Sequence, residues 1–142
     1  MDVSNRTRAR VPDARRLATE ILAAEGTTHA VLSIAFVGEI GIRRLNRDHL
    51  GHDRVTDVIA FSLAPAPGSA QGAPAPVVGD VYICPAVAAR NARAAGVTPR
   101  EELRRLVVHG TLHVLGYDHP EGERRTASDM WRRQERYLRR FR

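Results

Sequence analysis

Residues 98–116 read TPREELRRLVVHGTLHVLG, and this stretch determines much of the expected fold. Thr98 is a good N-cap residue, Pro99 suits the first helical position, and Glu101 completes a capping box with Thr98. Apolar residues then recur at helical spacing, and Gly116 is a natural stop. The pattern predicts one long amphipathic helix that begins after Thr98 and ends before Gly116.

The segments on either side of this helix alternate between strand-like and helix-like patterns. The strand candidates are rich in β-branched residues, and they are residues 30–37, 56–63 and 77–84. The remaining helix candidates are residues 13–25, 40–46, 85–95 and 121–142. Together they predict an α+β fold, with a small mixed, mostly parallel sheet of about four strands flanked by about five helices.

Length and composition indicate one domain that spans residues 1–142. Residues 64–76, APAPGSAQGAPAP, carry no charge, and we expect them to form a flexible surface loop. No run approaches the ~18 apolar residues that a membrane span needs, so no membrane partner is expected. The N-terminus lacks the apolar core of a secretory signal, and the single cysteine, Cys84, cannot form an internal disulfide. A reducing, cytoplasmic location fits these features.

The chain carries a net charge of +6, and all 22 of its basic residues are arginines. Guanidinium groups suit phosphate, so nucleic acid is the natural class of partner; a basic surface with no specific partner is the alternative. In the last predicted helix, Arg132, Arg133, Arg136 and Arg140 either contact RNA or form a solvated face. Trp131 falls on the apolar side of that helix, and we expect it in the core.

Residues 109–119, HGTLHVLGYDH, contain three of the six histidines. His109 and His113 are four residues apart, so on a helix they share a face, about 5–6 Å apart at Cβ. Gly116 tolerates positive φ and lets the chain turn, which can bring His119 back toward the pair. The spacing H-x-x-x-H-x-x-G-x-x-H is that of the metzincin zinc proteases. It predicts a metal site with three imidazole ligands, whereas the alternative is a chance cluster.

The residue after the first histidine separates this motif from the peptidases. The metzincins have a glutamate there as the general base, and this chain has Gly110. A metallopeptidase is therefore disfavoured. Three neutral ligands would leave a zinc ion with its full charge and an open fourth position, which suits a phosphodiester. We expect one Zn²⁺ per chain.

The histidine motif and three other blocks resemble the YbeY family of bacterial rRNA maturation factors. The family signature is close to H-G-x-L-H-L-x-G-Y-D-H, which residues 109–119 match almost throughout. The resemblance runs from about Leu32 to Leu138, and the first dozen residues match nothing usable. The first of the other blocks runs from 45 to 61 and contains Leu45 and Asn46, His52 and Asp53, and TDVIAF at 56–61. The second is GDVYIC at 79–84, and the third is Met130 with Gln134 and Glu135.

This resemblance implies a small mixed sheet flanked by helices, with zinc held by His109, His113 and His119. It implies a metal-dependent endoribonuclease that acts on single-stranded RNA, with His113 in the catalytic centre. The implied role is maturation of the small-subunit rRNA 3′ end and ribosome quality control. Ribosomal RNA, ribosomal particles and ribosome-associated proteins are the expected partners.

The chain departs from the family at one functional position. Many members have an arginine two residues before the dipeptide that corresponds to His52 and Asp53, and here that position is Leu50. Arg54 directly follows this dipeptide, and we expect it to contact phosphate in place of the usual residue. If Arg54 does not replace that arginine, we expect the endoribonuclease activity to be weaker than in other members of the family.

Three carboxylates are candidates for a supporting role. Asp57 could orient a ligand histidine, although capping or turn formation is favoured. Asp80 lies in a predicted strand, where a carboxylate is uncommon, and it faces either the site or an edge. Asp118 could be a base, an acceptor for a ligand histidine or a turn residue. A rival function is a non-catalytic ribosome-assembly or RNA-binding factor with a structural zinc, whose fourth ligand would be His49, His52 or an acid.

Overall fold

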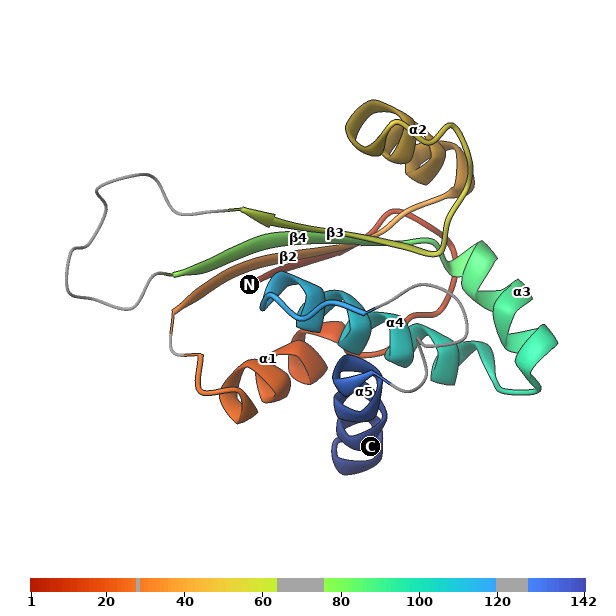
Figure 1. The fold of residues 1–142 in the computed structure, drawn as a ribbon. Helices are drawn as coiled ribbons and strands as arrows, with labels where there is room; N and C mark the ends of the chain where they lie inside the picture. Colours follow the sequence, from red (N-terminus) through yellow and green to blue (C-terminus); the bar gives the residue numbers. More distant parts are fainter. Residues whose placement is uncertain (28, 64–75, 120–127) are drawn as a thin grey trace.

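The computed structural model describes residues 1–27, 29–63, 76–119 and 128–142, which form a four-stranded sheet flanked by helices (Figure 1). The strands lie in the order β1-β2-β4-β3. They are β1 (Asp2–Asn5), β2 (Ala30–Phe36), β3 (Val58–Leu63) and β4 (Val77–Ile83). β1 pairs with β2 and β2 with β4 in parallel, and β3 pairs with β4 antiparallel. The sheet is therefore mixed and mostly parallel, as the sequence predicts.

Five helices lie within the described residues: α1 (Ala14–Ala24), α2 (Glu39–Leu50), α3 (Pro85–Ala95), α4 (Pro99–Val114) and α5 (Asp129–Arg140). α1 and α4 cover one face of the sheet, and α5 packs against α4 (Figure 1). α2 lies over one end of the opposite face (Figure 1). The predicted α+β class is confirmed. None of the described helices combines the length and the apolar character that crossing a bilayer would need.

The main core lies between the sheet and the α1–α4 layer. Alternate residues of β2 point into it, and Leu32, Ile34 and Phe36 are almost fully buried. α1 contributes Leu17 and Ile21 from one face of the helix. A smaller cluster on the opposite face of the sheet, under α2, consists of Ala35, Val37, Ile42, Ile59 and Cys84. Helix α4 is thus fixed against the sheet by the larger of the two cores.

Two glycines allow α4 to lie close to the sheet. A Cβ atom at Gly110 would be 2.5 Å from a Cγ atom of Val81 in β4. A Cβ atom at Gly79 would be 2.4 Å from a Cγ atom of Val114. A close-packed interior has no room for either contact. Gly110 is therefore required by packing, and a glutamate at this position would collide with the sheet.

The predicted helix boundaries hold well at α4 and less well at α2. The Thr98 hydroxyl accepts a hydrogen bond from the Glu101 amide at 3.1 Å, which confirms the N-cap. α2 continues to Leu50, about one turn beyond the predicted end, and stops where Gly51 adopts a φ of +73°. Only Ile42 and Asn46 of α2 are buried. Its sequence therefore carries too few apolar residues to indicate the full length of the helix.

The sequence analysis missed one strand and misplaced one aromatic residue. β1 lies in the N-terminal segment, where no element was expected, and forms an edge of the sheet. Trp131, expected in the core, is only half-buried and lies outside the main core cluster. Two predictions fall partly outside the described residues: the loop at 64–76, described only at residue 76, and the start of the helix predicted at 121–142.

The close approach of α4 to β4 leads to a first prediction. Gly110→Ala should lower the free energy of unfolding by about 1–2 kcal/mol, because overpacking against the stiff Val81 side chain exceeds the gain in helix propensity. Gly41→Ala in α2 is the matched control, since its nearest neighbour, Val37 Cβ, lies at an ordinary 3.8 Å. That variant should gain up to about 1 kcal/mol. Urea unfolding measures both, and equal stability of the two variants would contradict the close approach.

Candidate metal centre

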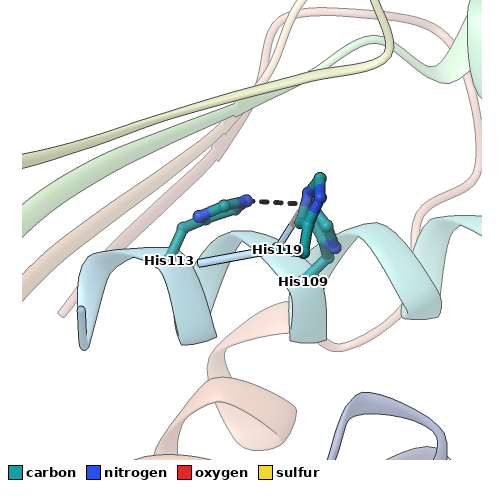
Figure 2. Close-up of side chains that lie close together, drawn as sticks. All are labelled: His109, His113 and His119. Carbon is teal, nitrogen blue, oxygen red and sulfur yellow. Dashed lines mark hydrogen bonds between the residues drawn. The ribbon is translucent and has the colours of Figure 1, made fainter. Parts of the chain in front are cut away.

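Helix α4 and the turn that follows it bring three histidines together (Figure 2). His109 and His113 lie one turn apart on α4, with ring centroids 4.6 Å apart. Gly116 adopts a φ of +102°, and the reversed chain returns His119 to the pair. The His119 ring centroid lies 5.0 Å from that of His109 and 5.1 Å from that of His113. The predicted trio is thus positioned to bind a metal ion.

The geometry of the cluster fits zinc. One ligand nitrogen from each histidine lies within 4.8 Å of the others, and the Nε2 atoms of His109 and His113 are 3.1 Å apart. Tetrahedral zinc with Zn–N bonds of about 2.0–2.1 Å separates its ligand nitrogens by roughly 3.3 Å. His109 is only 6% exposed, whereas His113 and His119 are half-buried. The cluster is therefore buried on the side of His109 and partly exposed on the side of His113 and His119.

A chain of polar side chains determines which nitrogen of His109 carries a proton. The Arg105 guanidinium can only donate, and it binds both carboxylate oxygens of Glu135 at 2.9 and 3.2 Å. The Gln134 amide nitrogen donates to Glu135 at 3.4 Å, which turns the amide oxygen toward His109. That oxygen lies 2.7 Å from His109 Nδ1, so Nδ1 must be the donor. Nε2 is left with the lone pair that a metal requires.

Gln134 is the residue of this site to which the sequence analysis gave no role. It is only 1% exposed and lies on the inner face of α5 between Met130 and Leu138. A buried amide requires hydrogen-bond partners. A glutamine on the apolar face of an otherwise arginine-rich helix is therefore the sequence signal that could have identified it.

The turn that carries His119 is anchored to α1 through Glu25. The Tyr117 hydroxyl donates to Glu25 Oε1 at 2.5 Å, and the Tyr137 hydroxyl donates to Oε2. Arg133 also donates to Oε2, at 2.9 Å, and its guanidinium carbon lies 4.8 Å from the centre of the Tyr117 ring. Because Tyr117 is two residues before His119, Glu25 helps to hold the third histidine in place.

These contacts shift the pKa values of the groups involved. Burial raises the pKa of the Glu25 carboxyl, but hydrogen bonds from Tyr117 and Tyr137 and the charge of Arg133 lower it by more. The hydrogen bond to Glu25 raises the pKa of Tyr117. Burial, together with the same carboxylate, raises the pKa of Tyr137. Glu25 is therefore a charged group that the fold stabilises.

The three histidines line a pocket of about 420 Å³, together with the end of α2 and the start of β3. Two of the predicted carboxylates, Asp57 and Asp118, also line it. Asp57 accepts hydrogen bonds from the Val58 amide at 2.8 Å and from the Asn91 side chain at 3.2 Å. The first bond is local, to the next residue, and the second links the start of β3 to α3; neither of them reaches a histidine. Asp118 is exposed and accepts from the His119 amide at 2.9 Å.

Two other predicted site residues are not brought into this pocket. Asp80 is on β4 between Gly79 and Val81, which both face α4, so its side chain lies on the opposite face of the sheet. Arg54 is exposed and is not part of the pocket lining. Leu50, the residue in place of the usual arginine, does line the pocket.

The two histidines considered as a fourth ligand also lie outside the cluster. The His49 ring packs edge-on against Phe61, with centroids 5.4 Å apart. His52 is exposed. Among the described residues, the group of possible ligands consists of His109, His113 and His119.

A family model described as Endoribonuclease YbeY matches residues 2–142. The chain belongs to the YbeY family. Proteins named Endoribonuclease YbeY are similar to this chain over most of their own length. The protein of Geobacter sulfurreducens is 45% identical over 105 residues, which cover 74% of this chain and 69% of the relative. That of Geobacter metallireducens is 42% identical over 120 residues, 82% of this chain and 79% of the relative.

A solved structure supports the YbeY fold. The solution structure of TM1509 from Thermotoga maritima superimposes with a TM-score of 0.60 at 25% identity. The match covers 96% of this chain and 85% of that protein. The four-stranded mixed sheet with flanking helices is therefore the fold shared with this neighbour.

The hydrogen bond to His109 leads to a second prediction. Gln134→Met keeps the size of the side chain but removes the acceptor for Nδ1–H, and we expect zinc affinity to fall about 10- to 100-fold. Thr111→Val is the matched control, since it removes another buried 2.7 Å hydrogen bond from α4, to the Val107 carbonyl, without touching a histidine. Competition with a chelating dye measures both dissociation constants. Equal affinities would exclude an orienting role for Gln134.

The lowered pKa of Glu25 leads to a third prediction. A carboxyl with a lowered folded pKa stabilises the fold above its ordinary pKa of 4.5, and that contribution is lost as the pH falls through the folded value. At pH 7, Glu25→Gln should lower the free energy of unfolding by about 1–3 kcal/mol. The difference from wild type should shrink as the pH drops below 4.5. Urea unfolding at several pH values tests this, and a gap independent of pH would contradict it.

Proposed function

We propose that this chain is a zinc-dependent endoribonuclease that cleaves single-stranded RNA. Its substrate is ribosomal RNA, and its task is maturation of the small-subunit 3′ end and ribosome quality control in the cytoplasm. Ribosomal particles are its partners, with ribosome-associated proteins as further candidates. The proposal rests on membership of the YbeY family, whose members are named endoribonucleases, and on the three-histidine cluster.

The single observation that carries the proposal is the convergence of three imidazoles at the edge of an open pocket. His109, His113 and His119 would hold the ion, and a zinc ion there supplies Lewis acidity toward a phosphodiester oxygen or toward water. The close packing of Gly110 against Val81 leaves no room for the glutamate of the zinc peptidases. The donor set therefore supports a hydrolytic zinc site while disfavouring peptide hydrolysis.

The chain's own residues would position the reactants. We propose that Asp118, exposed in the pocket beside His119, accepts a proton during cleavage. Asp57 would act mainly through its bonds to Val58 and Asn91, which fix the pocket wall. Arg54 stays a proposed phosphate contact that would have to reach the pocket from outside its lining. We assign no catalytic role to Asp80, because it faces away from the cluster.

A second candidate is a ribosome-assembly or RNA-binding factor whose zinc is structural. One observation favours it: none of the described residues that line the pocket is an arginine, and Leu50 stands at the usual arginine position. A structural zinc, however, has four protein ligands. Within the described parts of the chain the cluster provides three. This supports the catalytic proposal over the structural one.

The activity test compares two histidine variants. His113→Ala removes a proposed ligand and should abolish cleavage of a single-stranded RNA and release the zinc. His52→Ala is the matched control, because His52 is exposed and lies outside the cluster, and it should keep the wild-type rate and one zinc per chain. Cleavage that survives in purified His113→Ala would assign the activity to a contaminant or another site.

The products and the metal content separate the remaining alternatives. A 2′,3′-cyclic phosphate end means that the RNA 2′-hydroxyl attacked, whereas a simple phosphate end means that water did. Zinc that stays bound with RNA binding intact but no cleavage in the wild type would support the structural candidate. Loss of zinc from His52→Ala or His49→Ala would do the same, since it would reveal a fourth protein ligand.

A further inference from the structure

A second hollow, of about 340 Å³, lies between the first turns of α4 and the end of α5. Arginines from both segments line it, namely Arg100, Arg104, Arg105, Arg139 and Arg142. An α-helix rises about 1.5 Å per residue, so Arg100 lies roughly 20 Å along α4 from His113. The two pockets share no lining residue. The arginine hollow is therefore a feature separate from the metal centre.

The charges in the arginine hollow are not balanced. Two carboxylates line it, Glu101 and Glu135, and both pair with Arg105, at 3.8 and 2.9 Å. Within the described residues, the ion pairs leave Arg100, Arg139 and Arg142 without an acidic partner. The hollow thus concentrates positive charge that the protein does not neutralise.

The state of Arg104 is consistent with this excess. Burial, and then the charges of Arg100 and Arg142, lower the pKa of Arg104. In contrast, hydrogen bonds to Asp53 and Glu135 raise the pKa values of Arg43 and Arg105. A bound anion would relieve the repulsion at Arg104.

The hollow is also held in shape by the fold. Arg104 donates to the Phe141 carbonyl at 2.7 Å, which joins α4 to the end of α5. The Phe141 ring stacks on Tyr137, with centroids 5.7 Å apart. The capped N-terminus of α4 at Thr98 opens on the same hollow and adds the positive end of the helix dipole. The two segments that carry the arginines are therefore joined to each other around the hollow.

We propose that the arginine hollow binds backbone phosphates of the RNA strand that is cleaved at the metal centre, and this inference rests on the proposed function. Guanidinium groups bind phosphate oxygens in pairs, which suits a backbone better than a base. The described lining of the metal pocket contains no arginine, so arginine contacts to the backbone phosphates come from outside that lining. The arginine hollow provides such contacts. Because they reach only the backbone, they would bind a strand of any sequence.

The test measures binding of a single-stranded RNA by fluorescence anisotropy over a range of salt concentrations. The hollow variant is Arg100→Gln/Arg139→Gln/Arg142→Gln, which leaves Arg104 and Arg105 with their structural partners. Glutamine is a good helix former, and these three positions are exposed, so the variant should fold as wild type, which circular dichroism verifies. We expect binding to weaken about tenfold and the salt slope to fall by roughly 0.7 for each phosphate that the variant no longer binds.

The matched control removes the same charge elsewhere. Arg6→Gln/Arg8→Gln/Arg93→Gln changes three exposed arginines outside the hollow and lowers the net charge equally. It should bind RNA within about twofold of wild type and keep most of the salt slope. An equal loss of affinity in both triple variants would assign the effect to net charge alone and overturn the proposal. Wild-type affinity in the hollow variant would overturn it as well.

Two further arms identify the ligand and separate this inference from the proposed function. Inorganic phosphate at constant ionic strength should not compete with RNA at low millimolar concentration; if it does, the hollow is a site for small anions and the strand proposal is wrong.

The same wild-type and variant samples are assayed for cleavage of the RNA. Histidine-dependent cleavage with unchanged affinity of the hollow variant refutes the hollow alone. Hollow-dependent binding without any cleavage by the wild type refutes the nuclease and leaves the hollow standing.

Discussion

The arrangement of the three histidines depends on how closely α4 lies against β4. The contact of Gly110 with Val81 determines which side of the helix faces the sheet, and therefore where the residues on either side of it point. With the glycine turned inward, His109 and His113 are left at the side of α4 that borders β3 and the pocket. The same contact explains why the chain lacks the peptidase glutamate. The close packing of α4 against β4 thus limits which residue can follow the first histidine of the motif.

The histidines are then fixed by contacts that come from the rest of the fold. His109 is oriented from α5 through Gln134, and His119 is held through Tyr117 and Glu25 at the end of α1. His113 lines the open pocket and is less buried than His109. Such preorganisation matters because a ligand set that is already in place loses little conformational entropy when an ion binds. The site is therefore built by three helices rather than by its motif alone.

The sequence predicted the features that follow from local rules. Thr98, the i, i+4 histidine pair and Gly116 act within a few residues, so α4 and the convergence of the three histidines could be inferred in advance. β1 could not, because its four residues, DVSN, become a strand only by pairing with β2. The contact of Glu25 with Tyr117 spans 92 residues of sequence, and that of His109 with Gln134 spans 25. Side-chain alternation on β4 is predictable, but the face that Asp80 occupies depends on where the helices pack.

The position of Gln134 on α5, after the histidines of α4, has a consequence for protein synthesis. Chains emerge from the ribosome from their N-terminus, and α4 is translated before α5. Until α5 has emerged and docked, His109 lacks the acceptor that fixes its tautomer. A nascent chain therefore carries its histidines without the partner that prepares them for a metal. The histidine cluster is in this way completed only after α5 has docked.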